Sequence, residues 1–159
     1  MTKVFIDGSA GTTGLRIVQR LSERKDLALL ILPDELRKDP AARADALASA
    51  DIAFLCLPDD AARESAALAA GSKVKIIDTS TAHRTDPRWV YGMPELTGLR
   101  QKIAASSRIA NPGCHASGFV ALVAPLVEQG ILSPETALSA FFPHRLFRRR
   151  QGHDRSVRK

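Results

Sequence analysis

A cysteine follows an Asn-Pro-Gly turn in the segment NPGCHASGF, residues 111–119, directly before an apolar run with helical character. This position puts the sulfur of Cys114 near a helix N-terminus, which stabilises a thiolate. His115 is adjacent, but neighbouring side chains on a helix do not face each other, so we do not assign it as a base. The residues alone leave two interpretations of Cys114 open, a catalytic nucleophile and a structural thiol.

The other cysteine has a different setting. Cys56 lies in the apolar run AFLCL, where burial raises the pKa of a thiol and makes it inert. We therefore predict a packing role for it in the core. The two cysteines are far apart in the sequence and form neither a metal motif nor a disulfide framework. No metal site is predicted, and a reducing compartment suits such cysteines.

A glycine-rich turn lies between the first apolar run and the first amphipathic segment. Its spacing is G-x-x-G-x-x-G rather than the commoner G-x-G-x-x-G. Glycines in such a turn let backbone N–H groups approach a pyrophosphate at the helix N-terminus, and neighbouring hydroxyls add donors. The alternative is a turn without a ligand, but its place favours a dinucleotide site. The candidate residues are Gly8, Ser9, Gly11, Thr12, Thr13 and Gly14.

The residues after the second apolar run bear on which dinucleotide binds. Asp34 or Glu35 would hold the ribose 2′-hydroxyl of NAD, whereas Arg37 or Lys38 would meet the 2′-phosphate of NADP. We favour NADPH as the cofactor, with Arg37 and Lys38 as the residues that bind it. No Gly-Lys-Ser/Thr follows the glycines, which excludes a nucleoside triphosphate P-loop.

Short apolar runs alternate with helical patterns along most of the chain. The predicted strands cover 3–7, 27–32, 51–57, 73–78 and 107–111, and the clearest helices cover 40–50, 59–70 and 115–129. Strands that are apolar throughout are typical of a parallel sheet with helices on both faces. The sequence therefore predicts a doubly wound α/β domain, a Rossmann-like dinucleotide-binding domain.

The positive charge of the chain is confined to one segment. The net charge is +6 over 159 residues, and residues 143–159 alone carry seven basic residues and one acidic residue. The remainder is neutral, so we predict no nucleic-acid partner, although a genuine basic arm remains the alternative for the tail.

No apolar stretch is long enough to span a membrane, and the N-terminus has no signal-peptide pattern. We expect a cytoplasmic protein.

A dinucleotide turn combined with a thiolate at a strand end indicates a specific chemistry. Such a site suits reduction of an acyl phosphate or aldehyde, with the cysteine as covalent nucleophile and the nicotinamide as hydride donor. The alternative is a dinucleotide-binding module without catalysis.

Five motifs together carry a resemblance that extends from about Thr2 to Ala140. They are FIDGSAGTTGL, FLCLPDDAARES, IIDTSTAHR, WVYGMPEL and ANPGCHASGFVALVAPLVEQGIL. In this order they resemble the short (type 2) N-acetyl-gamma-glutamyl-phosphate reductases of arginine biosynthesis. The rival family is aspartate-semialdehyde dehydrogenase, which is similar in fold and in its thioester chemistry. Its cysteine motif typically reads Asn-Cys, where this chain has Gly113 before Cys114.

The resemblance implies roles for individual residues. Cys114 would attack an acyl-phosphate substrate, and NADPH would reduce the resulting thioester. Leu57 and Pro58 would border the nicotinamide. Ser80 and Arg84 are candidates near the substrate, although a structural turn explains them as well. Glu95 would orient groups of the site or serve as a structural residue. Members of the family usually have an aromatic residue after the cysteine, whereas this chain has His115.

The resemblance stops before the end of the chain. We expect an NAD(P)-binding domain over residues 1–140 and a disordered basic tail over 141–159, with the substrate and dimerisation domain of the family missing. That domain implies a homo-oligomer for full-length members, and it carries their acid/base histidine. Deleting one T from one codon choice for residues 141–154 yields the family's Gly-Tyr-Ser-Gly-Gly-Gly-Lys motif. We therefore interpret the tail as the product of a single-base insertion, and we expect impaired activity.

Overall fold

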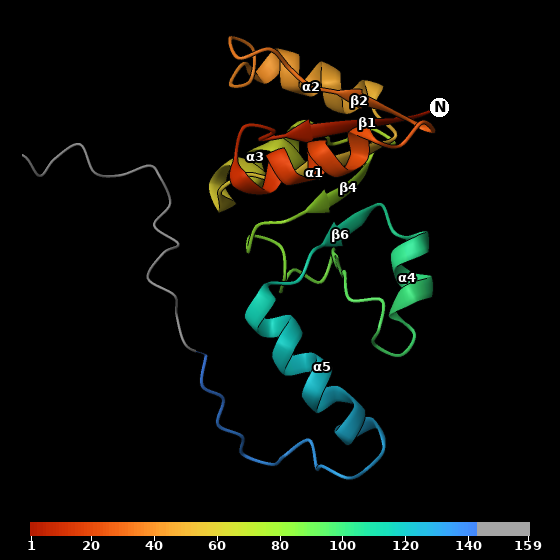
Figure 1. Ribbon diagram of the computed structural model, residues 1–159, viewed down its shortest axis with the longest axis vertical. Coiled ribbons are helices and arrows are strands. Elements are labelled where there is room, and N and C mark those ends of the chain that lie inside the picture. Colours follow the sequence, from red (N-terminus) through yellow and green to blue (C-terminus); the bar gives the residue numbers. More distant parts are fainter. Residues whose placement is uncertain (143–159) are drawn as a thin grey trace, which may run out of the picture.

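A six-stranded parallel sheet forms the centre of the computed structural model, which describes residues 1–142. The strand order is β2-β1-β3-β4-β6-β5. The strands are β1 (Thr2–Asp7), β2 (Leu27–Leu30), β3 (Ile52–Leu55), β4 (Lys75–Asp78), β5 (Val90–Tyr91) and β6 (Arg108–Ala110). The helices are α1 (Thr12–Ser22), α2 (Pro40–Ser49), α3 (Asp59–Leu68), α4 (Leu99–Ala105) and α5 (Cys114–Glu128). Figure 1 shows their arrangement.

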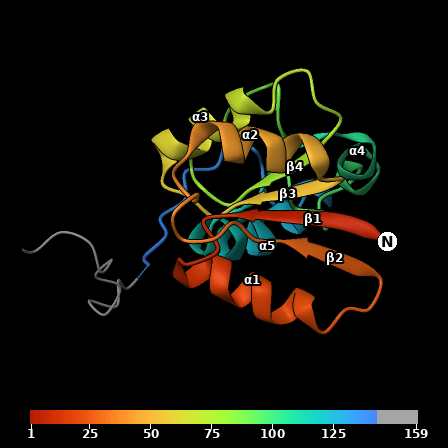
Figure 2. The same cartoon turned by 90° about the horizontal axis from the view of Figure 1, so that it is seen from above.

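Helices lie on both faces of the sheet, which confirms the predicted doubly wound α/β class. Figure 2 shows α1 on one face and α2 and α3 together on the other. The chain passes from β1 to β2 on one side and later returns to β3 on the other side of β1. In parallel α/β sheets, ligands bind at the carboxyl ends of the strands at such a reversal.

Local sequence signals account for the helix ends. The side chain of Asp39 accepts a hydrogen bond of 2.7 Å from the backbone N–H of Ala42, and Pro40 occupies the first turn of α2. Both features favour a helix start. Asp59 and Asp60 lie in the first turn of α3, where acidic groups interact favourably with the helix dipole.

The core lies between the sheet and the α2–α3 layer. It contains Phe5, Leu47, Leu55, Val74 and Ile76, each no more than 1% exposed. Burying side chains of this size contributes about 1.5–3 kcal/mol each. This layer fixes β1, β3 and β4, and therefore the loops that follow them.

The other face of the sheet is less covered than the apolar pattern predicts. Burial alternates along β3 and β4, so that Ile52, Phe54 and Ile77 are only half-buried. Within residues 1–142, α1 packs on this face against β1 and β2 at one side of the sheet. Burial on both faces was therefore predicted wrongly for β3 and β4, and the half-buried Phe54 and Ile77 border an opening.

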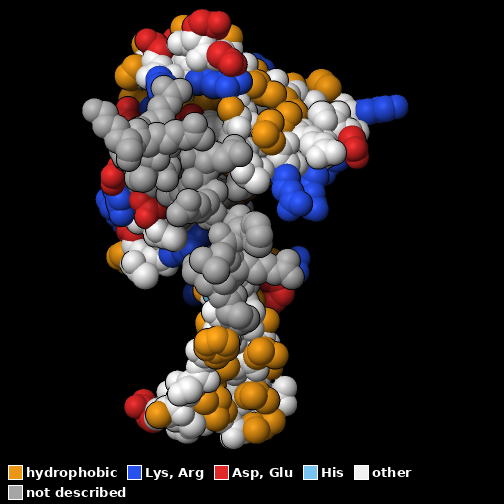
Figure 3. Space-filling view, turned by 60° about the vertical axis from the view of Figure 1, so that its left-hand side comes forward, with side chains coloured by type: hydrophobic (Ala, Val, Ile, Leu, Met, Phe, Trp, Pro, Cys, Tyr) orange, Lys and Arg blue, Asp and Glu red, His pale blue; other side chains and the backbone are white. Residues whose placement is uncertain are grey.

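Helix α5 projects away from the sheet (Figure 1). None of its residues is buried, and Leu122 is 74% exposed. Apolar side chains gather on this projecting part in Figure 3. The predicted tail, 141–159, lies outside the described residues from position 143 onward.

Several element bounds differ from the predictions. Strands β2, β3 and β4 are shorter than the apolar runs 27–32, 51–57 and 73–78, and the two-residue strand β5 was not predicted. Helix α5 begins at Cys114 itself, one residue before the predicted start. Within residues 1–142, no helix is long and apolar enough to cross a membrane.

Candidate functional site

Loops that follow β4 and β6 meet the start of α1 at the carboxyl edge of the sheet. They border a cleft of about 290 Å³. Its lining residues are Thr13, Ile17, Phe54, Ile77, Thr79, Arg84, Asn111, Pro112, Gly113 and Cys114. The cleft therefore brings together the glycine turn, the half-buried face of the sheet and the cysteine motif.

The glycine turn is tightly packed against β3 and α1. Gly8 has a left-handed backbone with φ of +84°, and a Cβ there would lie 2.4 Å from the carbonyl oxygen of Cys56. A Cβ on Gly14 would lie 2.2 Å from the carbonyl oxygen of Gly8. Both glycines are required for the close approach of helix and strand, which is the role that dinucleotide turns give them.

The middle of the turn leaves room for a ligand. A Cβ on Gly11 would meet no atom closer than the Gly8 carbonyl oxygen, at 3.5 Å. Gly11 caps α1 without any side-chain hydrogen bond, so the first N–H groups of the helix remain available to an anion. Thr13 lines the cleft, Thr12 is exposed at the helix start, and Ser9 is buried within the turn.

Cys114 is exposed and occupies the first position of α5. The turn before it is well anchored, because the carbonyl oxygen of Gly113 accepts the backbone N–H of Ser117 at 2.8 Å and its hydroxyl at 2.9 Å. A sulfur at this position in the cleft is accessible to a small electrophile, as a nucleophile must be. His115 packs its ring on Phe142, with ring centroids 5.0 Å apart.

Cys56 lies one residue beyond β3 and is half-buried. The prediction that it packs in the core was therefore wrong. Burial raises the pKa of its thiol to about 11, and the nearby carboxylates of Asp7 and Asp78 also raise it. A hydrogen bond with Thr79 acts in the opposite direction. The expectation of an inert thiol fits this environment.

Arg84 spans the two strand ends beside the cysteine. Its Nε donates to the carbonyl oxygen of Asn111 at 3.0 Å, and its Nη2 donates to that of Thr79 at 3.2 Å. Asn111 and Thr79 were not among the predicted site residues. Asn111 stands in the quoted cysteine motif and Thr79 in IIDTSTAHR, so position within a motif was the available signal for both.

Ser80 does not line the cleft. Its hydroxyl donates to the carboxylate of Asp78 at 2.7 Å, and its backbone N–H donates to the same group at 2.9 Å. The buried Asp78 carboxylate also bonds Nδ1 of His83 at 2.7 Å, and His83 stacks on Trp89. These contacts give Ser80 a place in the folded loop after β4.

The residues predicted to discriminate the cofactor lie in the loop between β2 and α2, outside the cleft. Arg37 pairs with Asp34 at 2.6 Å, and its buried Nε has no hydrogen-bond partner among the described residues. Lys38 is exposed. An orphaned guanidinium nitrogen is a donor that a bound phosphate could satisfy.

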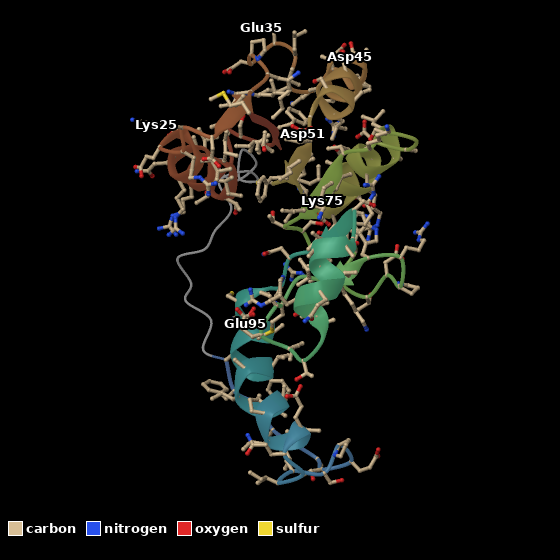
Figure 4. All side chains as sticks on the ribbon, turned by 90° about the vertical axis from the view of Figure 1, so that its right-hand side faces the viewer. Lys25, Glu35, Asp45, Asp51, Lys75 and Glu95 are labelled. Carbon is tan, nitrogen blue, oxygen red and sulfur yellow. The ribbon has the colours of Figure 1, made fainter. Side chains whose placement is uncertain are left out.

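The remaining predicted residues are not among those that line the cleft. Leu57 packs at the glycine turn, with its Cδ2 3.1 Å from where a Cβ on Gly8 would lie, and Pro58 is the N-cap of α3. Glu95 lies in the turn between β5 and α4, and Glu35 lies in the loop between β2 and α2, far from Glu95 in the view of Figure 4. Within residues 1–142, no three His, Cys, Asp or Glu side chains gather as a metal site.

Known proteins resemble this chain over most of its length. The family described as "Semialdehyde dehydrogenase, NAD binding domain" matches residues 32–106. N-acetyl-gamma-glutamyl-phosphate reductase 2 of Pseudomonas putida is 55% identical over 137 residues, which are 86% of this chain and 44% of that protein. The reductase of Trichormus variabilis is 56% identical over 131 residues, 82% of this chain and 41% of that protein.

This chain is a relative of the N-acetyl-gamma-glutamyl-phosphate reductases. The resemblance inferred from the five motifs is thereby confirmed. The chain spans less than half the length of these reductases.

Solved structures support the fold. Aspartate semialdehyde dehydrogenase from Francisella tularensis superposes with a TM-score of 0.62 at 20% identity, covering 82% of this chain and 42% of that one. The dehydrogenase from Candida albicans, solved with NADP, gives a TM-score of 0.58 at 17% identity, covering 81% of this chain and 47% of that one. These dehydrogenases therefore share the fold of this chain, and the sequence identity favours the reductases over the rival family.

Proposed function

We propose that this chain carries the cofactor turn and the nucleophile of an NADPH-dependent acyl-phosphate reductase acting on N-acetyl-glutamyl phosphate. One observation carries the proposal: Thr13, from the glycine turn, and Cys114 line the same cleft. The names of the related reductases supply the substrate.

The described residues fit a dinucleotide. The tight packing at Gly8 and Gly14, the open space at Gly11 and the uncapped start of α1 form a cradle for the pyrophosphate. Arg37 would meet the 2′-phosphate of NADPH through its orphaned Nε, with Lys38 beside it. Leu57 and Pro58 would border the nicotinamide from the β3 side of the turn.

The reaction starts at the sulfur of Cys114. Its thiolate attacks the acyl carbon, a C–S bond forms, and the C–O bond to the phosphate breaks to release inorganic phosphate. NADPH, when bound, supplies the hydride that reduces the thioester carbon. The C–S bond then breaks as the carbonyl group of the aldehyde forms, and its electron pair returns to Cys114, which is again a thiolate.

Backbone N–H groups of the cleft act on the phosphate and the developing oxyanion. The N–H groups at the start of α5 lie next to Cys114, which occupies the first position of the helix. Such groups stabilise negative charge in a site partly shielded from water. None of the residues that line the cleft in the described part is a histidine or a carboxylic acid, so we expect slow turnover from these residues alone.

Acyl transfer tests the proposal without requiring turnover. The purified chain is incubated with N-acetyl-glutamyl phosphate in the absence of NADPH, and its intact mass is measured over time. We expect one acyl adduct on the parent chain, an equal adduct on Cys56→Ser and none on Cys114→Ser. Absence of the adduct from a chain whose Cys114 alkylates normally with iodoacetamide would overturn the proposal. If that chain still bound NADPH, as measured by the fluorescence of the nucleotide, the result would favour a dinucleotide-binding module without catalysis.

The compartment and assembly state belong to the same proposal. We propose a cytoplasmic protein with a small-molecule substrate, no nucleic-acid partner, and a homo-oligomeric state for full-length relatives. Removal of residues 143–159 tests the last point. A salt-dependent shift of labelled DNA that persisted after this removal would contradict the proposed absence of a nucleic-acid partner.

A further inference from the structure

Arg84 connects two loops that come from different strands. The Asn111 carbonyl that accepts its Nε directly follows β6, and the Thr79 carbonyl that accepts its Nη2 directly follows β4. A guanidinium can donate to two such acceptors at once because its N–H groups form a rigid fork. The side chain therefore fixes the distance between the two strand ends next to the cysteine.

Gly113 is shaped to this guanidinium. A Cβ on Gly113 would lie 2.6 Å from Nη1 of Arg84. The backbone of Gly113 has φ of −83° and ψ of 153°, an extended conformation that any residue adopts. A side chain at this position would therefore displace the guanidinium end of Arg84, so the constraint on Gly113 is one of space rather than of backbone conformation. The absent side chain gives Arg84 its place against the residue that precedes Cys114.

Asn111 is held from two sides. Its backbone N–H donates to the carbonyl oxygen of Asp78 at 2.7 Å, while its own carbonyl oxygen accepts from Arg84. The next two residues lead directly into α5 at Cys114. The direction in which α5 leaves the sheet therefore depends on these bonds.

The loop that carries Arg84 is itself rigidly held. Asp78 accepts three hydrogen bonds, from the N–H and hydroxyl of Ser80 and from the imidazole of His83, the neighbour of Arg84. The imidazole stacks on Trp89 with ring centroids 4.0 Å apart. Because His83 is anchored, Arg84 begins from a fixed backbone position.

We propose that Arg84 is a positioning residue for Cys114: it locks the 111–113 turn, with Gly113 as its matched partner, and so sets where the sulfur lies in the cleft. The inference rests on the proposed function for the meaning of that position. It differs from a role as a substrate ligand, because it acts through the Asn111 carbonyl.

Single-thiol chains based on Cys56→Ser test this role. The variants are Arg84→Gln, Arg84→Lys, Gly113→Ala and the double variant Gly113→Ala/Arg84→Gln. Arg88→Gln is the matched control, since Arg88 lies four positions along, has a side chain that is 84% exposed, and forms its ion pair with Asp86 on the surface, away from the cleft. Thermal unfolding verifies that each chain folds. Acylation of Cys114 is followed by mass as a function of acyl-phosphate concentration.

Loss of the clamp should slow the maximal acylation rate. We expect a loss of about tenfold or more in Arg84→Gln, with little change in the half-saturating concentration, because a misplaced nucleophile affects the chemical step. Arg84→Lys should not restore the rate, since an ammonium cannot reproduce the fork. Added guanidinium ion should restore part of it. Gly113→Ala should lose a similar factor, and the double variant should be no worse than either single one.

Hydrogen exchange separates this inference from the proposed function. The amides of Asn111 and Ser117 should exchange faster in Arg84→Gln and recover with guanidinium ion, while the amide of Phe5 in the core stays unchanged. That result supports the clamp even if no acyl adduct forms on the parent chain. Unchanged exchange and an unchanged maximal rate would overturn it. A rise in half-saturating concentration alone would also overturn it, and would make Arg84 a phosphate ligand.

Discussion

Arg43 and Asp7 form a buried ion pair at the carboxyl end of β1, immediately before the glycine turn. Nη2 of Arg43 lies 3.1 Å from Oδ2 of Asp7, and the two side chains are 6% and 4% exposed. The hydroxyl of Ser65 donates to the same carboxylate oxygen at 2.6 Å, and Arg43 also contacts Glu64 at 3.2 Å. The pair therefore ties the strand that carries the turn to α2 and α3.

Removing one member of this pair should be costly. Arg43→Ala leaves the Asp7 carboxylate buried without its counter-charge, and we expect a loss of about 3–5 kcal/mol in the free energy of unfolding. Chemical denaturation measures this loss. Arg63→Ala is the control, because Arg63 lies on the surface of α3 with its side chain 54% exposed, and it should have little effect. Equal effects of the two variants would contradict a structural role for the buried pair.

The glycines of the turn should differ in what they tolerate. Gly14→Ala places a Cβ 2.2 Å from the Gly8 carbonyl oxygen, and we expect about 3 kcal/mol or more of destabilisation from this overlap. Gly11→Ala meets no such contact, so the chain should fold but bind NADPH more weakly, because the methyl group occupies the cradle. Denaturation and NADPH fluorescence separate the two effects.

A helical glycine provides the matched control for this comparison. A Cβ on Gly118, within α5, would meet no atom within 4 Å. Gly118→Ala should therefore stabilise the chain by about 0.5–1 kcal/mol through the reduced backbone entropy of the unfolded state. If Gly14→Ala were tolerated as well as Gly118→Ala, this would contradict the claim that α1 approaches the turn too closely for a side chain at position 14.

The two thiols should react at very different rates. Cys114 is exposed, whereas Cys56 is half-buried and has a pKa raised to about 11. Since the thiolate is the reactive species, at pH 8 only about one thousandth of Cys56 is in that form. Iodoacetamide followed by peptide mapping should modify Cys114 first, by about tenfold or more. The Cys56 rate should climb as pH rises toward 11, and faster modification of Cys56 at pH 8 would refute this order.

Cofactor preference should depend on Arg37. Arg37→Ala removes the guanidinium proposed to meet the 2′-phosphate, so NADPH binding should weaken by about tenfold or more, which corresponds to losing a charge-assisted hydrogen bond of about 1.5–3 kcal/mol. NADH binding should change little. Fluorescence titrations of both nucleotides measure the ratio, with Lys25→Ala as an exposed control. An equal loss of NADH affinity would instead indicate that Arg37 has a structural role, through its ion pair with Asp34.

Local sequence features predicted the fold and the position of the glycine turn, because both depend on local chemistry. Apolar runs set the strands, and the glycine spacing set the turn whose packing the structure shows at Gly8 and Gly14. The run AFLCL was extended too far because apolar character continues beyond the hydrogen-bonded ladder of β3, which ends at Leu55. The pattern also could not reveal which face of β3 and β4 is open, since both faces carry apolar residues.

The links between distant residues could not be predicted from spacing. Arg84 and Asn111 are 27 positions apart, and Asp7 and Ser65 are 58 positions apart. Arg84 and Asn111 meet because parallel strands bring their carboxyl ends to one edge of the sheet. Asp7 and Ser65 meet because the buried face of α3 packs against the end of β1. Arg84 was identified as a candidate from its motif, but its acceptors follow only from strand order. Ser80 lies outside the cleft for a local reason, since its hydroxyl bonds to Asp78, two positions before it.

The reading frame of the tail gives the last prediction. Residues 143–159 carry the whole excess of positive charge, and the motif resemblance ends just before them. If a single inserted base shifts the frame near Phe142, the coding DNA should contain one T too many in the run that encodes Phe141 and Phe142. Removing that base should open a frame that continues Ser-Leu-Thr-Gly-Tyr-Ser-Gly-Gly-Gly-Lys. Resequencing the DNA across codons 138–159 and beyond measures this directly. An unchanged sequence with no such frame would make residues 143–159 a genuine basic arm, whose binding to nucleic acid would then need a salt-dependent assay.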